Sequence, residues 1–451
     1  MRRRRRRWAG DPHLRETGFN RLWFGETVSQ AGSEITFLAI PLTALLLLDA
    51  SALEMGILGA AGSAASLVFG LPAGVWVDRF ERRRMMQLAN VARMIVISLV
   101  ALLAWRDALS MPVLYGATFL IGTFTLIFDS AFAAYLPRLL RKRGLLEANA
   151  RMQASVATAE VAGPGVSGAM VQLLGAPLTL LVDAVTFLAS IFALRTLPPA
   201  AATPQDGADA HEASYAAIRG GIAFIARDAV MRPLTVAAAH FNVFTSMFFA
   251  VYMLYVVREL DFSPLTLGLL TVAGGLAGIT MAGSAGRLAR RVGMGRLLIV
   301  VYALPGMGAL LVPLAGTTGR IPALLLVGTC QVVWAGSVVV NLTLSETLKQ
   351  SIVPDGLLGR VSATIRFVSW GGEPIGALIG GVLASAVLGL SGTLVLAGVG
   401  VLLSAIWPLC SASVRRTSEA PRPSPEHEAD VALETASTVT QGDEPAHAKH
   451  L

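Results

Sequence analysis

Charged residues are scarce in this chain of 451 residues: they make up 14%, against 54% apolar residues. The mean hydropathy is +0.64. A soluble domain has about 25% charged residues, so this composition excludes an ordinary water-soluble globule. The length instead leaves room for many membrane-spanning helices of about 20 residues each.

Cysteine and lysine are rare as well. The two cysteines, Cys330 and Cys410, lie in apolar segments, so neither a disulfide framework nor a thiolate metal site is indicated. Lysine occurs 3 times and arginine 33 times. Together with abundant alanine and glycine, this bias indicates GC-rich coding DNA rather than binding of nucleic acid, so we expect no nucleic-acid partner.

Signatures of catalysis are missing. The sequence contains no phosphate-binding G-x-x-x-x-G-K-[ST] loop and no His/Cys cluster with the spacing of metal ligands. We therefore predict no catalytic residues, no cofactor and no metal site, and we do not expect an enzyme. Any activity that needs energy would have to draw on an ion gradient.

What the chain does have is a series of apolar segments of spanning length, separated by short polar, glycine or proline segments. We count twelve of them, which predicts an all-α membrane protein with 12 transmembrane helices. The predicted spans are 21–48, 53–77, 84–105, 112–136, 149–174, 177–197, 233–258, 264–288, 295–316, 321–346, 358–387 and 390–411.

One connection is much longer than the others and divides the helices into two groups of six. It ends in an amphipathic stretch at residues 215–228, which is expected to lie on the membrane surface. The C-terminal tail is rich in Pro, Ser, Thr and Glu and is expected to be disordered. The predicted division is a basic cytoplasmic tail at 1–18, an N-terminal half at 19–197, a central cytoplasmic linker at 198–232, a C-terminal half at 233–411 and a cytoplasmic tail at 412–451.

The distribution of arginine predicts the orientation, because inner loops carry more positive charge than outer loops. With the N-terminus in the cytoplasm, the outer loops hold only Arg106, Arg258 and Arg320. An even number of spans then places both termini in the cytoplasm. Two interpretations of the run Arg2–Arg7 stay open: a patch that binds anionic lipid, or a start codon assigned too far upstream.

Two motifs recur at nearly the same offset, which indicates that the chain arose by duplication. Residues 74–84 read GVWVDRFERRR, and residues 286–296 repeat this loop in degenerate form as GRLARRVGMGR, 212 residues later. Proline motifs in the fifth and eleventh spans are offset by 210 residues, from Pro164 to Pro374. The expected result is two six-helix halves with the same direction in the membrane.

The loop at residues 74–84 resembles the G-x-x-x-D-R-x-x-R-R signature of the major facilitator superfamily of secondary transporters. Residues 19–411 as a whole are similar to its bacterial drug and siderophore exporters, a group that contains macrolide efflux proteins and enterobactin exporters. The similarity is carried by FNRLWFG at 19–25, SQAG at 29–32 and VPDGLLGRV at 353–361, and GPG at 163–165 resembles a helix motif associated with antiporters.

This resemblance implies a major facilitator fold in the bacterial cytoplasmic (inner) membrane. It also implies a small amphipathic organic substrate and protons as the coupling ion. We expect the lipid bilayer to be the main surrounding partner and the protein to be a monomer. One departure concerns the first helix, where the group often has Asp directly after Gly and this chain has Gly32-Ser33-Glu34.

The first span carries polar side chains that should not face lipid. Glu26, Gln30 and Glu34 follow one another at i, i+4 and i+8, which places them on one stripe. An ionisable side chain at bilayer depth costs about 2.5–3.5 kcal/mol, so we expect this stripe to line the space between the halves. Glu34 is the first candidate for binding a proton or substrate, whereas Glu26 could instead pair with an arginine near the cytoplasm.

Two further carboxyl groups lie beside prolines. Glu160 precedes Pro164 by one turn, and Glu373 directly precedes Pro374. A carboxyl group in apolar surroundings can take up and release a proton, so both are candidate proton carriers; the alternative is a structural role, with Glu373 satisfied by Arg366 or by freed backbone groups. Proline and glycine also allow bending and close packing at the seam between the halves. The residues predicted to do this are Gly163, Pro164, Gly168, Pro374 and Gly376.

Other polar and aromatic residues occur in the seventh and tenth spans. His240, Asn242 and Asn341 are candidates for a proton or substrate site, although a single polar contact between helices is the alternative for each. Aromatic residues could form an apolar wall for the substrate or simply face lipid. These aromatic residues are Phe241, Phe244, Phe248, Phe249 and Trp370.

The charged loop after the second span predicts an inner gate. Asp78 could meet the N-terminal end of the eleventh helix, and the arginines that follow it could reach Asp129. In the second copy Asp78 aligns with Arg290, so that copy lacks the acidic partner. The alternative is that the arginines only fix the topology. The predicted gate consists of Gly74, Asp78, Arg79, Arg82, Arg83, Asp129, Arg360 and Arg366.

Two more ionisable residues receive structural interpretations. Arg93 in the third span is expected to pair with a carboxylate, with Asp129 as the first choice, and Asp183 is expected near the outer end of the sixth span.

The sequence as a whole predicts a proton-coupled exporter of amphipathic molecules, such as drugs or siderophores, that works by alternating access. The alternatives are a lipid or lysolipid flippase or a metabolite importer of the same fold, and a non-transporting membrane sensor or scaffold.

Overall fold

The computed structural model describes residues 18–140, 144–198 and 220–417, without the side chains of residues 71–75, 78, 355 and 356. The run Arg2–Arg7, most of the central linker and the tail beyond residue 417 therefore lie outside the described residues. The same holds for the side chain of Asp78 and for the surroundings of Gly74.

Six long helices form the first half of the molecule. α2 packs against α6 and α7, α3 against α5, and α4 against α5 and α7. Their ends lie within a few residues of the predicted spans except where a helix runs on into a loop. The helices are α2 (Phe19–Leu47), α3 (Ala52–Arg79), α4 (Arg82–Trp105), α5 (Met111–Leu139), α6 (Leu145–Leu174) and α7 (Ala176–Arg195).

The second half is built from shorter pieces, and four of its predicted spans are interrupted. The eleventh span, predicted as one helix, is broken at Gly371 and Gly372, because two glycines followed by Pro374 favour ending one helix and starting another. In contrast, α6 continues through Pro164 without a break. The helices are α9 (Met231–Arg258), α10 (Pro264–Ala282), α11 (Ala285–Val292), α12 (Met294–Ala309), α13 (Leu311–Ala315), α14 (Arg320–Ile352), α15 (Asp355–Trp370), α16 (Glu373–Ala386), α17 (Gly389–Leu403), α18 (Ile406–Cys410) and α19 (Ala412–Arg416).

Within the described ranges the structure is helical and contains no strand. Eleven segments there are long and apolar enough to cross a membrane. The remaining long helix, α6, has 30 residues but is less apolar, because it carries Glu147, Arg151 and Glu160. It nevertheless packs between α2 and α10 like its neighbours, so it completes the predicted set of twelve.

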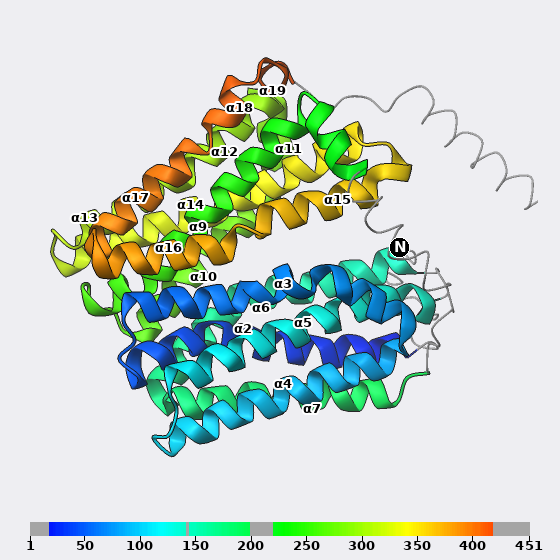
Figure 1. Ribbon diagram of the computed structural model, residues 1–451, viewed down its shortest axis with the longest axis vertical. Helices are drawn as coiled ribbons and strands as arrows, with labels where there is room; N and C mark the ends of the chain where they lie inside the picture. The colour runs from blue at the N-terminus through cyan, green and yellow to red at the C-terminus, as the bar shows by residue number, and fades with distance from the viewer. Residues whose placement is uncertain (1–17, 141–143, 199–219, 418–451) are drawn as a thin grey trace, which may run out of the picture.

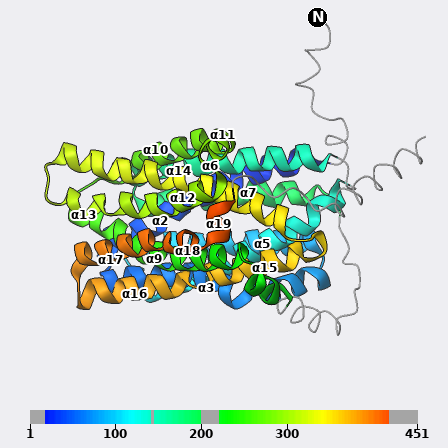
Figure 2. The same ribbon diagram turned by 90° about the horizontal axis from the view of Figure 1, so that it is seen from above.

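The two halves lie side by side with their long helices running in roughly the same direction (Figures 1 and 2). α3 packs against α16, and α6 packs against α10. At the left of Figure 1 the ribbons of the halves meet, near the loops at residues 48–51 and 259–263. At the right they diverge, between α3 and α15. We call these the closed end and the divergent end.

Glycines allow the halves to touch near the closed end. A Cβ atom on Gly56 of α3 would lie 2.6 Å from the carbonyl oxygen of Ala377 on α16. On the other side of the seam, Gly168 of α6 is equally unable to carry a side chain, because it lies against the backbone of Pro264. Helix backbones therefore meet directly across the seam, which is the packing that small residues permit in membranes.

The loops of the closed end preserve the duplication. Asp49 and Asp261 both adopt the left-handed conformation, with φ of 49° and 53°, which Asp tolerates better than most residues. Ser51 and Ser263 follow them, and each side chain accepts a hydrogen bond from the backbone N–H three residues on, at the start of α3 and α10. Both pairs are 212 residues apart, the same offset as the charged loops.

Candidate functional site

Glu34 and Glu160 lie where α2 crosses α6. A Cβ atom on Gly163 would collide with the side chain of Glu34, so this glycine sets how closely the two helices approach. Gln30 Nε2 donates a hydrogen bond to Glu34 Oε1 over 3.0 Å. Glu160 is exposed and close enough to act on Glu34 electrostatically. In the described part of the chain, neither carboxyl group belongs to an ion pair.

Glu26 does not share this environment. With 3.6 residues per turn, positions i and i+8 differ by roughly 80° around the helix. Glu26 and Glu34 of α2 therefore point in different directions and can have different neighbours. Glu26 is 7% exposed and accepts a hydrogen bond from Ser190 of α7. The expectation of one common polar face is therefore wrong: Glu34 points towards α6, and Glu26 points into the first half.

Arg93 of α4 lies in the same interior. Its guanidinium donates to Thr125 and Asn90 and lies over the rings of Phe128 and Phe187, 4.9 and 4.6 Å from their centroids. No ion pair among the described residues includes Arg93, so the predicted pairing with Asp129 is not formed.

Asp183 also differs from its prediction. It is fully buried and accepts hydrogen bonds from Thr36 of α2 and Thr186 of its own helix. It therefore holds α2 and α7 together rather than lying at a helix end. The sequence does not predict these contacts. Thr186 lies only three residues from Asp183 but is an ordinary helix residue, and Thr36 lies 147 residues away in the chain.

Glu373 begins α16, directly after the break in the eleventh span. Its carbonyl oxygen accepts a hydrogen bond from Ser246 of α9 over 2.5 Å, while its side chain is half-buried. Arg366 does not pair with it; the guanidinium lies 5.6 Å from the ring of Trp370. Gly376, one turn on, lies against the backbone of Val243, so this part of α16 packs closely on α9.

His240 connects three helices of the second half. Its Nε2 donates to the carbonyl of Gly400 over 2.9 Å, and its Nδ1 accepts from the indole N–H of Trp407 over 3.1 Å. Because an imidazole nitrogen that accepts a hydrogen bond carries no proton, these contacts hold the ring neutral. The geometry favours the interhelical contact over the proton site for this residue.

The two asparagines lie on the helices that face each other across the second half. Asn242 is half-buried on α9. Asn341 Oδ1 of α14 accepts a hydrogen bond from Ser345 of the same helix over 3.5 Å, and its Nδ2 atom is buried without a hydrogen-bond partner among the described residues. An unpaired buried donor is costly, so Asn341 has spare hydrogen-bonding capacity.

Aromatic rings gather between α9 and α14. Phe241, Phe248 and Phe249 lie with ring centroids 6.0, 5.2 and 5.1 Å from that of Trp334. Tyr252 stacks on Phe248 at 5.4 Å. We call these five residues the aromatic cluster. Sequence reasoning missed Trp334 and Tyr252, since α9 and α14 are brought together only by the fold.

Two of the aromatic residues predicted to form this wall lie elsewhere. Phe244 packs against Gly400 of α17, and Trp370 lies at the end of α15. Within the cluster, Phe249 is the ring that remains open, at 41% exposure.

At the divergent end, no ion pair is recorded among the described side chains between Asp129 and Arg79 or Arg83. The side chain of Asp78 lies outside the described ones, and Arg82 is buried. Arg83 donates to the carbonyl of Leu197 over 2.6 Å and lies 3.4 Å from Glu81. Arg84 pairs with the same Glu81 at 2.6 Å. Glu81, the local partner of both arginines, is not among the predicted gate residues. Three other predicted gate residues, Arg79, Arg360 and Arg366, are exposed, as is Asp129.

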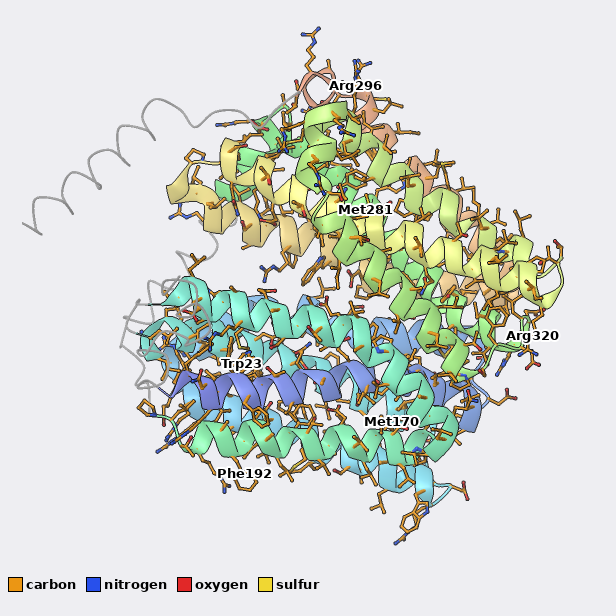
Figure 3. All side chains as sticks on the ribbon, turned by 180° about the vertical axis from the view of Figure 1, so that it is seen from behind. Trp23, Met170, Phe192, Met281, Arg296 and Arg320 are labelled. Atoms are coloured by element: carbon orange, nitrogen blue, oxygen red, sulfur yellow. The ribbon has the colours of Figure 1, made fainter. Side chains whose placement is uncertain are left out.

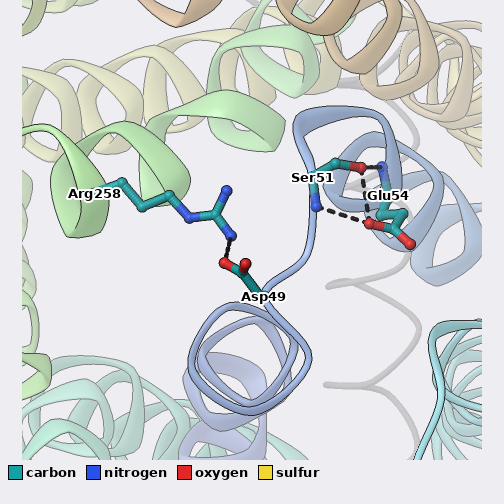
Figure 4. Close-up of polar contacts among 4 residues, drawn as sticks. All are labelled: Asp49, Ser51, Glu54 and Arg258. Carbon is teal, nitrogen blue, oxygen red and sulfur yellow. Dashed lines mark hydrogen bonds and ion pairs between the residues drawn. The ribbon is translucent and has the colours of Figure 1, made fainter.

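The closed end has a polar contact that the sequence did not predict. Arg258, at the end of α9, forms an ion pair with Asp49, in the loop between α2 and α3 (Figure 4). Next to it, Ser51 and Glu54 form a capping box that begins α3. Across the other seam, Gln172 accepts a hydrogen bond from the backbone N–H of Leu265 over 3.2 Å. Both contacts join the two halves.

A cavity of about 420 Å³ lies between α2 and α6. It is lined by Trp23, Thr27, Arg151 and Ser155, among others, and by neither Glu34 nor Glu160. Trp23 lies on the outer face of the first half, where α2 is visible between α6 and α7 (Figure 3). Gly163, which lies against the Glu34 side chain, is also among the lining residues, so the cavity comes close to the carboxyl pair without being lined by it.

The fold and its buried ionisable groups define a membrane transporter, not an enzyme. The family model of the Major Facilitator Superfamily matches residues 22–373. The chain belongs to this superfamily, and it is a multi-pass protein of the bacterial cytoplasmic membrane.

Two curated relatives match over most of their length. The chain is 28% identical to "Multidrug efflux pump Tap" of Mycolicibacterium fortuitum over 373 residues, covering 80% of this chain and 88% of Tap. It is 25% identical to "Enterobactin exporter EntS" of Citrobacter koseri over 382 residues, covering 84% of this chain and 88% of EntS. These are relatives in the drug and siderophore exporter group that the sequence resembles.

Solved structures show the same fold at low identity. A bacterial homologue of the iron transporter ferroportin in an inward-facing state matches with a TM-score of 0.70 and 15% identity, covering 89% of this chain and 99% of that one. A bacterial ferroportin homologue in an outward-facing state matches with a TM-score of 0.54 and 16% identity, covering 87% and 99%.

Proposed function

We propose that the protein exports amphipathic organic molecules in exchange for protons, by alternating access to a site between its halves. The observation that carries this proposal is the pair Glu34 and Glu160: two neighbouring carboxyl groups within membrane-spanning helices, without a cationic partner among the described residues. Such a pair can hold protons or a positively charged group of a substrate, but not easily both. The names of Tap and EntS support outward transport.

The conformation supports an inward-open state. If the charged loops face the cytoplasm, the divergent end is the cytoplasmic end. Arg296 and Arg320 lie at opposite ends of the second half (Figure 3), and Arg320 is one of few arginines at the closed end. The higher TM-score against the inward-facing ferroportin homologue agrees with this assignment.

Exchange would then follow from competition at the carboxyl pair. In the inward-open state, a substrate that enters from the cytoplasm displaces protons from Glu34 and Glu160, and Phe249, the exposed ring of the aromatic cluster, packs against its apolar part. For outward opening, the ion pair between Asp49 and Arg258 must break, and the seams between α3 and α16 and between α6 and α10 must part near the closed end. Protons from outside then displace the substrate.

Efflux of ethidium from everted membrane vesicles, energised by a proton gradient, tests the proposal. Glu34→Gln should abolish proton-driven ethidium transport, because a neutral amide can neither release a proton nor attract a cation. Glu147→Gln is the matched control. This glutamate lies on α6, as Glu160 does, but it is already paired with Arg151 at 2.6 Å. Full proton-driven transport by Glu34→Gln would contradict the proposal.

A further inference from the structure

The interior of the first half contains a cation without a counter-ion. Arg93 is 5% exposed, and its Nε atom has no hydrogen-bond partner. Its other contacts are neutral groups and two aromatic rings. A buried charge is normally paired, because taking an unpaired ion out of water is costly. A guanidinium arranged in this way has donors free for an acceptor that is not engaged in this state.

Three carboxyl groups surround Arg93, one from each neighbouring part of the half. Glu26 of α2, Asp129 of α5 and Asp183 of α7 are the groups that act on it electrostatically. Asp183 already accepts two threonine hydroxyls. Glu26 and Asp129 each accept fewer hydrogen bonds, and they act on each other as well.

A chain of hydrogen bonds connects Arg93 to Glu26. Arg93 donates to Asn90 Oδ1, Asn90 Nδ2 donates to Ser190 Oγ over 2.7 Å, and Ser190 donates to Glu26. Asn90 and Ser190 are fully buried. The charge on Arg93 and the charge on Glu26 therefore influence each other through two fixed side chains, without direct contact.

The charges of this cluster do not balance unless protons are bound. One guanidinium and the two buried carboxylates, if ionised, would leave one uncompensated negative charge in an apolar interior, and ionised Asp129 would add a second at its exposed edge, which is unfavourable. Protons must make up the difference. Asp129 is exposed, so it is the member of the cluster through which protons can enter, whereas Glu26 and Asp183 are buried.

We infer that Glu26, Asp129 and Arg93 form a second proton-binding site, inside the first half, at which a proton and Arg93 compete for the carboxylates. The inference rests on the proposed function, because it adds a proton site to the exchange. With protons bound, Arg93 stays on Asn90 and Thr125, as in this structure. When a proton leaves through Asp129 to water, Arg93 pairs with the carboxylate that remains and draws α4 towards α2 and α5.

Infrared titration of the purified full-length protein in liposomes tests this site without any substrate. The carboxyl C=O band reports protonated Asp and Glu side chains, and its loss with rising pH gives a midpoint. Glu26→Gln and Asp129→Asn identify the part of the band that belongs to the site. Arg93→Gln should raise the midpoint of that part by at least about one pH unit, a tenfold change in proton affinity, because the cation that favours the ionised form is gone.

Two variants separate this role from a structural one. Arg93→Lys keeps the positive charge and should restore most of the shift. Arg151→Gln, which removes an arginine of the same half that is paired with Glu147, should leave the midpoint unchanged. If Arg93→Gln does not fold, Ser190→Ala gives the second test, since it cuts the hydrogen-bonded chain and should also raise the midpoint of Glu26.

The outcomes distinguish this inference from the proposed function. A wild-type midpoint in both Arg93→Gln and Ser190→Ala would overturn the second proton site. Exchange of ethidium for protons is measured in the same liposomes. Normal exchange without a midpoint shift refutes only the second site; a midpoint shift without any exchange in the wild type refutes the exporter proposal and leaves proton binding at the cluster standing.

Discussion

The two halves share an origin but differ in what fills their interiors. The first half encloses Glu26, Arg93 and Asp183, all buried. The second half encloses the aromatic cluster, whose members Phe248, Tyr252 and Trp334 are also buried. The two halves have similar helix arrangements, but the interior of the first contains charged residues and that of the second contains aromatic residues. We infer a division of labour, with proton binding in the first half and contact with apolar substrate in the second.

The largest effect should come from opening a hole in the aromatic half. Trp334→Ala removes the ring against which three phenylalanines pack, and loss of a large aromatic side chain typically costs about 3–5 kcal/mol. Thermal unfolding of the purified protein in detergent should show a strongly lowered midpoint. Trp105→Ala is the control, because this ring is 76% exposed at the end of α4. An equal loss in both variants would contradict the packing role of the cluster.

A smaller effect is expected at the open edge of the same cluster. Phe249→Ala should raise the apparent KM for ethidium by up to about tenfold, since an aromatic contact is worth about 0.5–1.5 kcal/mol. The pH dependence of transport should stay as in the wild type. A changed pH profile with an unchanged KM would reverse the proposed division between the halves.

The ion pair at the closed end should have a modest effect on conformation. Asp49→Asn should increase the population open at that end by at most about fivefold, because an exposed ion pair is worth about 1 kcal/mol or less. Spin labels at Asp107→Cys and Thr317→Cys, in loops of the two halves, would measure the separation after both native cysteines are replaced.

The repeat supplies a matched control for this measurement. Asp261→Asn makes the same change in the equivalent loop of the second half. By the 212-residue offset, the counterpart of Arg258 is Leu46 of the first half, which has no charge. Asp261 accordingly has no ion pair with the other half among the described residues. The substitution should leave the distance distribution unchanged. Equal opening by both substitutions would show that loop conformation, not the ion pair, holds this end.

The smallest effect is expected at His240. His240→Gln should change ethidium transport by no more than about twofold and leave its pH profile unchanged, since Trp407 and Gly400 hold the ring neutral. Transport is measured between pH 6 and 8, roughly the range in which an ordinary histidine titrates. A loss of pH dependence in this variant would restore His240 as a proton site.

The sequence predicted the fold well because hydrophobic length and glycine or proline punctuation are local signals. The number of apolar spans, the two halves and the close packing at Gly168 follow from such patterns, whereas Gly376 packs on α9 within the second half and not at the predicted seam between the halves. The break after Trp370 was missed, since a Gly-Gly-Glu-Pro segment inside an apolar run is compatible with either a kink or a new helix.

The site was predicted less completely, because its geometry depends on contacts between distant segments. Glu34 and Glu160 could be selected as candidate site residues from the free-energy cost of placing an ionisable side chain in a membrane span, which makes such residues rare there. The surroundings of Glu26 could not, because Asn90 and Ser190 are ordinary polar residues in sequence and become a connected chain only in the packed half. The gate prediction placed its contacts at the charged loops, whereas the ion pair recorded between the halves, Arg258 with Asp49, lies at the closed end.

The glycine seam has a consequence for the speed of the conformational change. Helices that interlock through side chains must move them out of their staggered rotamers before one helix can slide past the other. At Gly56 and Gly168 there are no rotamers to change, so the backbones can roll over each other without that activation barrier. Under the proposed exchange, turnover would then be set by release of protons and substrate, and even a single methyl group added at Gly56 would slow transport, because it would lie 2.6 Å from the carbonyl oxygen of Ala377.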